Sequence, residues 1–284
     1  MLLGKANMEI RTNGFLIYVR TFGAEKSINK YVGLIPIAGI ALSLVLELAL
    51  GLRGQYVFNP LFLRIALNVI LVAVICFFVS YLSAKGYLLT GSLTLLIITM
   101  AFVYISIVSI IIGWLSNFSA NWGVTLNGLD LLLFSALQLF ASFQASFRSV
   151  PFGSEHRKVR LALACAAAVF LSGLLSLLTV LKVFPTFFIN GVGVTLTDQV
   201  VFSTSVLLFS LSSALFLRQY LKSKSNVLYW YTLALVLDAV GAFGITLQLR
   251  FSDIVVWTGR LGLYLATVYF LIALLSSRKD NNEV

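Results

Sequence analysis

The chain has 284 residues, of which 60% are hydrophobic and only 11% charged. Soluble domains average roughly 45–50% apolar and about 25% charged residues, so this composition excludes an ordinary soluble protein and predicts lipid as the solvent. The net charge of +10 does not require nucleic acid, which we do not expect as a partner, because basic residues in a membrane protein first report its topology.

Apolar stretches of about 20 residues predict membrane-spanning helices, because hydrocarbon leaves every backbone polar group to be paired within its own element. The sequence therefore predicts an all-α polytopic bundle of eight transmembrane helices in one domain, 32–276, between an N-terminal arm, 1–31, and a short tail, 277–284. The expected helices cover 32–51, 61–83, 88–115, 127–147, 161–181, 196–217, 228–247 and 254–276.

Basic residues predict that both termini are cytoplasmic and that the protein is a multi-pass protein of the cell membrane. In this orientation the loop residues Lys85 and Arg157 face the cytoplasm, as do most other Lys and Arg residues, in keeping with their excess in cytoplasmic loops. Only five of the twenty basic residues would lie in the outer half: Arg53, Arg64, Lys182, Arg250 and Arg260.

The arm is basic and partly amphipathic. Its segment 15–19 is apolar and is followed by Arg20, a pattern that favours a segment lying flat on anionic headgroups at the cytoplasmic face. A protein-docking arm is the alternative.

Ionisable residues inside spans are costly and are therefore candidates for function. Two of them have a simpler explanation, because Asp130 follows Asn127 and Asp198 follows Thr195 by three residues, the spacing of a capping box at a helix start. We therefore expect these four residues to be helix caps. Arg64 lies near a predicted helix end and is expected to extend its guanidinium into the interface.

Asp238 and Arg260 lie deeper, on helices joined by a short turn, and are expected to face each other. They form either a structural ion pair or, together with Glu47, Gln248 and Trp257, the polar wall of a ligand pocket open to the outside.

Small residues predict close helix packing in lipid. They are frequent in the helix expected at 161–181, which includes Ala168 and Ser172. Gly241 and Gly244 in the helix expected at 228–247 predict the same close packing, with a helix kink as the alternative.

Catalytic and cofactor signatures are missing from the sequence. The single histidine, His156, lies in a predicted cytoplasmic loop, and Cys76 and Cys165 lie singly within apolar stretches. Paired ligands for haem or zinc are therefore not expected, and neither is any other cofactor. With no nucleophile motif or phosphate-binding glycine loop, the sequence does not predict an enzyme.

Three motifs in the second half carry a family resemblance. They are FFINGVGVT at 187–195, LYWY at 228–231 and WTGR at 257–260, the last followed by Tyr264-Leu265 and Tyr269-Phe270. Residues 185–278 thereby resemble the membrane-embedded N-terminal sensor region of archaeal histidine kinases and PAS-domain signalling proteins, especially those of methanogens.

The chain departs from this family at Leu196, where proline is frequent, and at Leu263 and Ala266-Thr267, which replace a glutamine and paired glycines. Only a short segment follows the last span, whereas the family continues into PAS or kinase modules. The resemblance thus implies a stand-alone sensor that acts through a cytoplasmic histidine kinase or PAS protein, or a truncated relative.

The leading hypothesis is a non-enzymatic sensor domain that detects an extracytoplasmic or membrane-borne signal. A small-solute transporter or permease that uses the same charges is the alternative, and a structural subunit of a membrane complex is a third possibility. The sequence does not identify the ligand or the oligomeric state.

Overall fold

The computed structural model describes residues 31–146, 153–189 and 192–279, apart from the side chains of Leu61, Ser154 and 277–279. The predicted N-terminal arm therefore lies almost entirely outside the described residues. In chain order the helices are η1 (Val32–Leu34), α3 (Ile35–Ala49), α4 (Leu61–Leu67), η2 (Asn68–Val74), α5 (Ile75–Thr90), α6 (Leu93–Phe118), α7 (Ala120–Ser146), η3 (Ser154–His156), α8 (Arg157–Val180), α9 (Leu196–Ser223), α10 (Asn226–Thr246) and α11 (Ile254–Lys279), and a hairpin of β1 (Phe188–Ile189) and β2 (Gly193–Val194) precedes α9.

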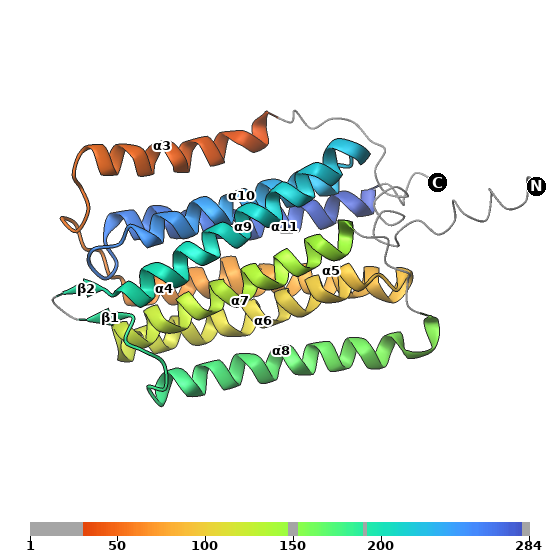
Figure 1. The fold of residues 1–284 in the computed structure, drawn as a ribbon, viewed down its shortest axis with the longest axis horizontal. Helices are drawn as coiled ribbons and strands as arrows, with labels where there is room; N and C mark the ends of the chain where they lie inside the picture. Colours follow the sequence, from red (N-terminus) through yellow and green to blue (C-terminus); the bar gives the residue numbers. More distant parts are fainter. Residues whose placement is uncertain (1–30, 147–152, 190–191, 280–284) are drawn as a thin grey trace, which may run out of the picture.

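Eight helices in the described part of the chain are long and apolar enough to cross a membrane, as predicted. The second of these spans combines α4, η2 and α5. Figure 1 shows the eight spans side by side along one direction, with α3 and α8 on opposite edges of the bundle. The chain is therefore a multi-pass membrane protein with an all-α bundle.

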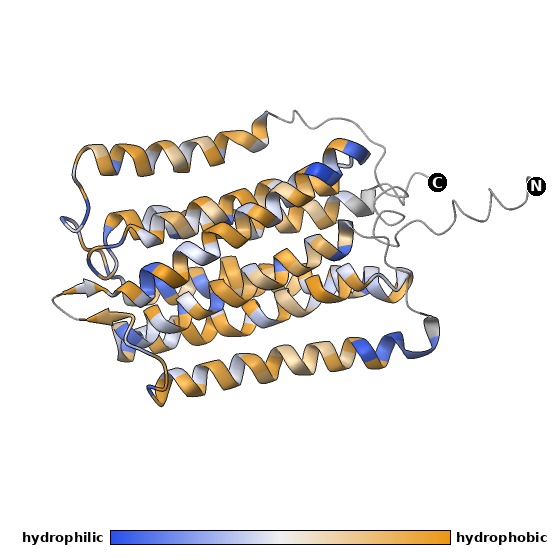
Figure 2. Cartoon of the chain, in the orientation of Figure 1, coloured by the Kyte–Doolittle hydropathy of each residue, from blue (hydrophilic) through white to orange (hydrophobic). Residues whose placement is uncertain are grey.

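Two ends of the bundle are distinct in Figure 1. The start of α3 and the end of α11 lie at one end, the terminal end, and the β1–β2 hairpin lies at the other, the hairpin end. Hydrophilic residues at the start of α8 and the end of α9 gather at the terminal end, whereas most of the length of these helices is apolar (Figure 2).

Two predicted boundaries are wrong because local capping signals were missed. The second span continues to Thr90, where Gly91 ends it in the left-handed conformation with φ of 70°, so Lys85 lies within a helix and not in a loop. The fourth span begins at Ala120 and not at residue 127, directly after the extended residue Ser119.

The core lies between α6, α7, α9, α10 and α11. Phe102, Phe134 and Phe270 meet there edge to face, with ring centroids 4.9–6.3 Å apart. The expectation of a tightly packed helix at 161–181 is confirmed along one face only, because α8 lies at the edge of the bundle and packs against α6 with Ala168, Ser172 and Thr179 buried. Its remaining small residues are partly or fully exposed and therefore do not bring helices together.

Helices α10 and α11 are in direct backbone contact, which confirms the packing role predicted for Gly241 and Gly244. A Cβ atom at Gly241 would lie 2.7 Å from the carbonyl oxygen of Gly259, and a Cβ atom at Gly244 would lie 2.9 Å from the Cα atom of Gly259. Gly262 completes the contact, since a Cβ there would meet Gly241 Cα at 3.1 Å. Any larger residue at these positions must push the helices apart.

We expect Gly241→Ala and Gly259→Ala each to lower the free energy of unfolding by about 1–3 kcal/mol, because the added methyl group overlaps backbone atoms that have no freedom to move. Thermal unfolding in detergent measures the effect. Gly173→Ala on α8 is the matched control, because no heavy atom lies within 4 Å of a Cβ at that helical position. Equal unfolding temperatures for the three variants would contradict the role of the α10–α11 contact.

Candidate functional site

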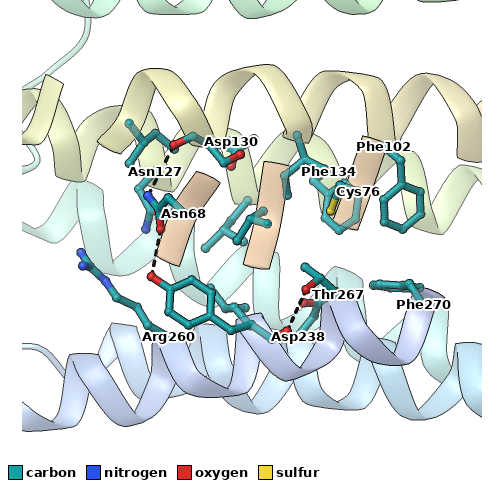
Figure 3. A pocket seen from close by; sticks show the side chains of 17 residues that line it. Asn68, Cys76, Phe102, Asn127, Asp130, Phe134, Asp238, Arg260, Thr267 and Phe270 are labelled. Atoms are coloured by element: carbon teal, nitrogen blue, oxygen red, sulfur yellow. Dashed lines mark hydrogen bonds between the residues drawn. The ribbon is translucent and has the colours of Figure 1, made fainter. Parts of the chain in front are cut away.

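A small cavity of about 60 Å³ lies inside the bundle. Its wall is formed by η2, α5, α6, α7, α10 and α11, and its polar members include Asn68, Asp130, Asp238, Arg260 and Tyr264. Figure 3 shows Asn127 and Asp130 entering from one side and Asp238 and Arg260 from the opposite side. Charged side chains from three different helices thus converge on one space.

The two aspartates of the cavity are almost fully buried, with 3% of Asp130 and 4% of Asp238 exposed. Oδ1 of Asp130, Oδ2 of Asp238 and Nη1 of Arg260 are buried without a hydrogen-bond partner in the structure. Burial of an unpaired polar atom costs about 1–3 kcal/mol, and more when the group is charged. Such groups persist inside a membrane chiefly where function requires them.

One wall of the cavity is a π-helix, η2, between α4 and α5. The hydroxyl of Thr267 on α11 lies 2.6 Å from the Leu71 carbonyl of η2 and 2.7 Å from the Tyr264 carbonyl of its own helix, and it donates one proton to this pair of acceptors. The Tyr264 hydroxyl donates to Asn68 Oδ1 at 2.9 Å. The Asn68 amide in turn donates to the Ser109 carbonyl at 3.4 Å. The cavity wall therefore joins α11 to α6 through side chains of η2. Single π-helical turns occur frequently at functional sites.

Asp238 and Arg260 both line the cavity, as expected of neighbouring helices, but they form no direct ion pair in the described structure. Figure 3 shows the Arg260 guanidinium pointing away from Asp238. It lies instead over the indole of Trp257, 5.5 Å from the ring centroid. The predicted structural ion pair is wrong because the long arginine side chain extends toward the hairpin end, where this aromatic ring is available.

The other predicted pocket residues do not line the cavity. Glu47 accepts a hydrogen bond from the Thr258 hydroxyl between α3 and α11, and its Oε2 has no partner. The Trp257 indole N–H donates to the Phe58 carbonyl at 2.7 Å. Gln248 is buried just beyond the end of α10, with Nε2 unpaired. Of the five residues predicted to form the ligand pocket, Asp238 and Arg260 line the cavity and the other three lie outside it.

Arg64 does not reach the interface, contrary to the prediction. It is 1% exposed, donates to Asn117 Oδ1 at 3.4 Å and stacks over the Phe251 ring at 5.1 Å. Phe251 belongs to the turn between α10 and α11, so the aromatic partner of Arg64 comes from a distant part of the sequence. The pattern of apolar residues within the second span does not predict this contact.

The predicted helix caps are confirmed at the start of α9 and are wrong in α7. Thr195 is an N-cap, confirmed by its hydroxyl, which accepts from the backbone N–H of Asp198 at 3.4 Å in the first turn of α9. Asn127 and Asp130 are not caps, because α7 begins seven residues before Asn127 at Ala120. Both line the cavity instead. The repeat Asp130, Phe134 and Gln138, at helical spacing on one buried face, is the signal that would have identified them.

We expect Thr267→Val to weaken the attachment of η2, because valine preserves the shape of threonine but lacks the hydroxyl that bonds Leu71. Interhelical hydrogen bonds in membranes contribute about 0.6 kcal/mol on average and up to about 1.7 kcal/mol. Amide hydrogen exchange in residues 68–75 should accelerate.

Thr232→Val is the control, since the buried Thr232 hydroxyl bonds only the Leu228 carbonyl of its own helix, at 2.7 Å. The prediction fails if both variants change exchange in 68–75 equally.

The chain matches no protein-family model and no curated protein, and its fold matches no solved structure. The role of each residue therefore rests on the geometry of the cavity.

Proposed function

We propose that the chain is a non-enzymatic sensor domain of the cell membrane that binds a small polar ligand in the central cavity and signals to a cytoplasmic partner. The observation that carries this proposal is the convergence of Asp130, Asp238 and Arg260 on one cavity, each with a buried polar atom unpaired. A bound ligand would supply the missing partners.

The cavity limits the size of that ligand. A volume of about 60 Å³ has room for a few water molecules or a small polar molecule. The Asp130 carboxylate on one wall, with the Asp238 carboxylate and the Arg260 guanidinium on the other, suits a ligand that offers both a hydrogen-bond donor and an acceptor. Such a ligand reaches the cavity from the outside or from the membrane.

Signal transmission requires a ligand with unequal affinity for two helix arrangements. Here the glycine contact holds α10 to α11, whereas η2 is joined to α11 by the side chains of Tyr264 and Thr267. A ligand that competes for Asn68 or Tyr264 would shift the second span against α11. Helix α11 ends at the terminal end, where the movement would reach a partner.

The proposed orientation places the terminal end in the cytoplasm. Arg157, Lys158 and Arg160 begin α8, and Lys222 lies in the last turn of α9. These residues gather at the terminal end, consistent with the positive-inside tendency and with contact to anionic headgroups. The partner we propose, from the resemblance in 185–278, is a histidine kinase or PAS protein.

A small-solute carrier is the second candidate, and one observation favours it. The second span is not a regular α-helix, since η2 interrupts it beside the charged cavity. Interrupted helices next to buried charges are common at the binding sites of transporters.

Cross-linking followed by purification of the tagged full chain from its native membrane tests the sensor. We expect a histidine kinase or PAS protein to co-purify with the wild type, and its amount to change at least about twofold in Asp130→Asn/Asp238→Asn, a shift of only about 0.4 kcal/mol in association. Asp198→Asn is the matched control, because Asp198 is also buried with Oδ1 unpaired but lies outside the cavity.

Recovery of the chain alone under cross-linking would contradict the sensor. Counterflow of a labelled solute in proteoliposomes, abolished in the double variant and retained in Asp198→Asn, would then establish the carrier. A partner that remains bound equally in all variants would assign the chain a structural role.

A further inference from the structure

The basic residues at the hairpin end are unusual for the proposed orientation. Positive side chains are disfavoured on the outer side of a membrane protein, yet five were predicted there. Arg64 and Arg260 are buried or line the cavity, which explains two of them. Arg53 and Arg250, far apart in sequence, line one second pocket, the vestibule.

The vestibule is an open pocket of about 730 Å³ at the hairpin end, within the range typical of sites for small organic ligands. It lies between the loop after α3, the β1–β2 hairpin and the turn that joins α10 to α11. Besides the two arginines, it is lined by Gly54, Gln55, Gly193 and Phe251 among others, and no carboxylate is among its described lining residues.

Nearby carboxylates are not available to neutralise these arginines. Asp253 is completely buried, and its two oxygens accept from the backbone N–H groups of Leu249, Arg250 and Val256 at 3.1–3.4 Å. Glu47 and Asp198 are also buried. The charged side chains that reach the surface at this end, in the described part of the chain, are the cations Arg53, Lys182 and Arg250.

The two arginines are positioned by the backbone around them. Nε of Arg53 donates to the Leu247 carbonyl at 2.9 Å, and no other hydrogen bond ties this guanidinium to the residues that the structure describes. The stem of Arg250 lies against Gly54, whose φ of 69° is readily adopted only by glycine, with Cγ and Cδ at 3.7 and 3.8 Å from the position of a Cβ atom there. The vestibule thus presents two cations, one of which, Arg53, has its guanidinium held by a backbone carbonyl.

We propose that the vestibule binds an oxyanion, a phosphate or carboxylate group, through Arg53 and Arg250. Guanidinium groups bind such groups with paired, charge-assisted hydrogen bonds. The group belongs to a soluble organic anion or to the headgroup of an outer-leaflet phospholipid. This binding does not depend on the sensor function, although the ligand would contact the turn between α10 and α11.

Binding of radiolabelled inorganic phosphate to the purified full chain in phosphatidylcholine nanodiscs tests the proposal. We expect saturable binding that weakens at least about tenfold in Arg53→Gln/Arg250→Gln, because each charge-assisted hydrogen bond contributes roughly that factor. Lys182→Gln is the control and should change affinity less than about twofold, since Lys182 is exposed at the same end but does not line the vestibule.

Arg53→Lys/Arg250→Lys keeps both charges without the planar fork and should bind with intermediate affinity. Unchanged thermal unfolding shows that the variants fold.

Mass spectrometry of bound lipid distinguishes the two sources of the oxyanion. Retention of phosphatidylglycerol by the wild type and not by the glutamine pair would identify a lipid headgroup as the ligand. Phosphate binding without lipid retention would identify a soluble anion. No saturable binding, or equal binding in the glutamine pair, would overturn the proposal.

Discussion

The backbone contact between α10 and α11 is the constraint on which the rest of the structure depends. Four glycines let the two helices approach until carbonyl oxygens and Cα atoms of one touch the other. Lipid provides no hydrophobic force to hold helices together, so close approach and dispersion contacts must do so. This contact sets the positions of Asp238 and Arg260, because both residues lie within one turn of a contact glycine.

The second structural theme is polarity enclosed by apolar helices. Most buried serines and threonines bond carbonyls of their own helix, as Ser83, Thr99 and Ser106 do, and so need no external partner. The cavity differs because charged groups from three separate helices converge on one space there, and each has an atom that finds no hydrogen-bond partner among the described residues. A purely structural bundle gains nothing from this arrangement, and for this reason the proposed function centres on the cavity.

At the hairpin end, polar side chains accept hydrogen bonds from the backbone of loops and turns. Asn121 Oδ1 accepts from the backbone N–H groups of Phe187 and Phe188 at 3.0 and 2.9 Å, and Asp253 organises the turn between α10 and α11. These two polar side chains therefore satisfy backbone N–H groups at the hairpin end of the bundle. Arg53 and Arg250, by contrast, line the vestibule, where the described residues include no carboxylate to neutralise them.

The sequence by itself determined the class of the fold, the number of spans and the contact role of Gly241 and Gly244, because apolar length and small-residue spacing act locally along one helix. It also identified the N-cap at Thr195, whose partner lies three residues away. The tertiary structure alone decided which polar residues share a cavity. The sequence predicts Asp130 as a cap, whereas α7 begins ten residues earlier at Ala120 and Asp130 lines the cavity from the middle of the helix. Depth in the membrane predicts Asp238 as the partner of Arg260, whereas the guanidinium lies over the ring of Trp257, three residues earlier on the same helix. Which polar residues share the cavity depends on the rotation of each helix about its axis, and packing against neighbouring helices sets this rotation without a short-range mark in the sequence.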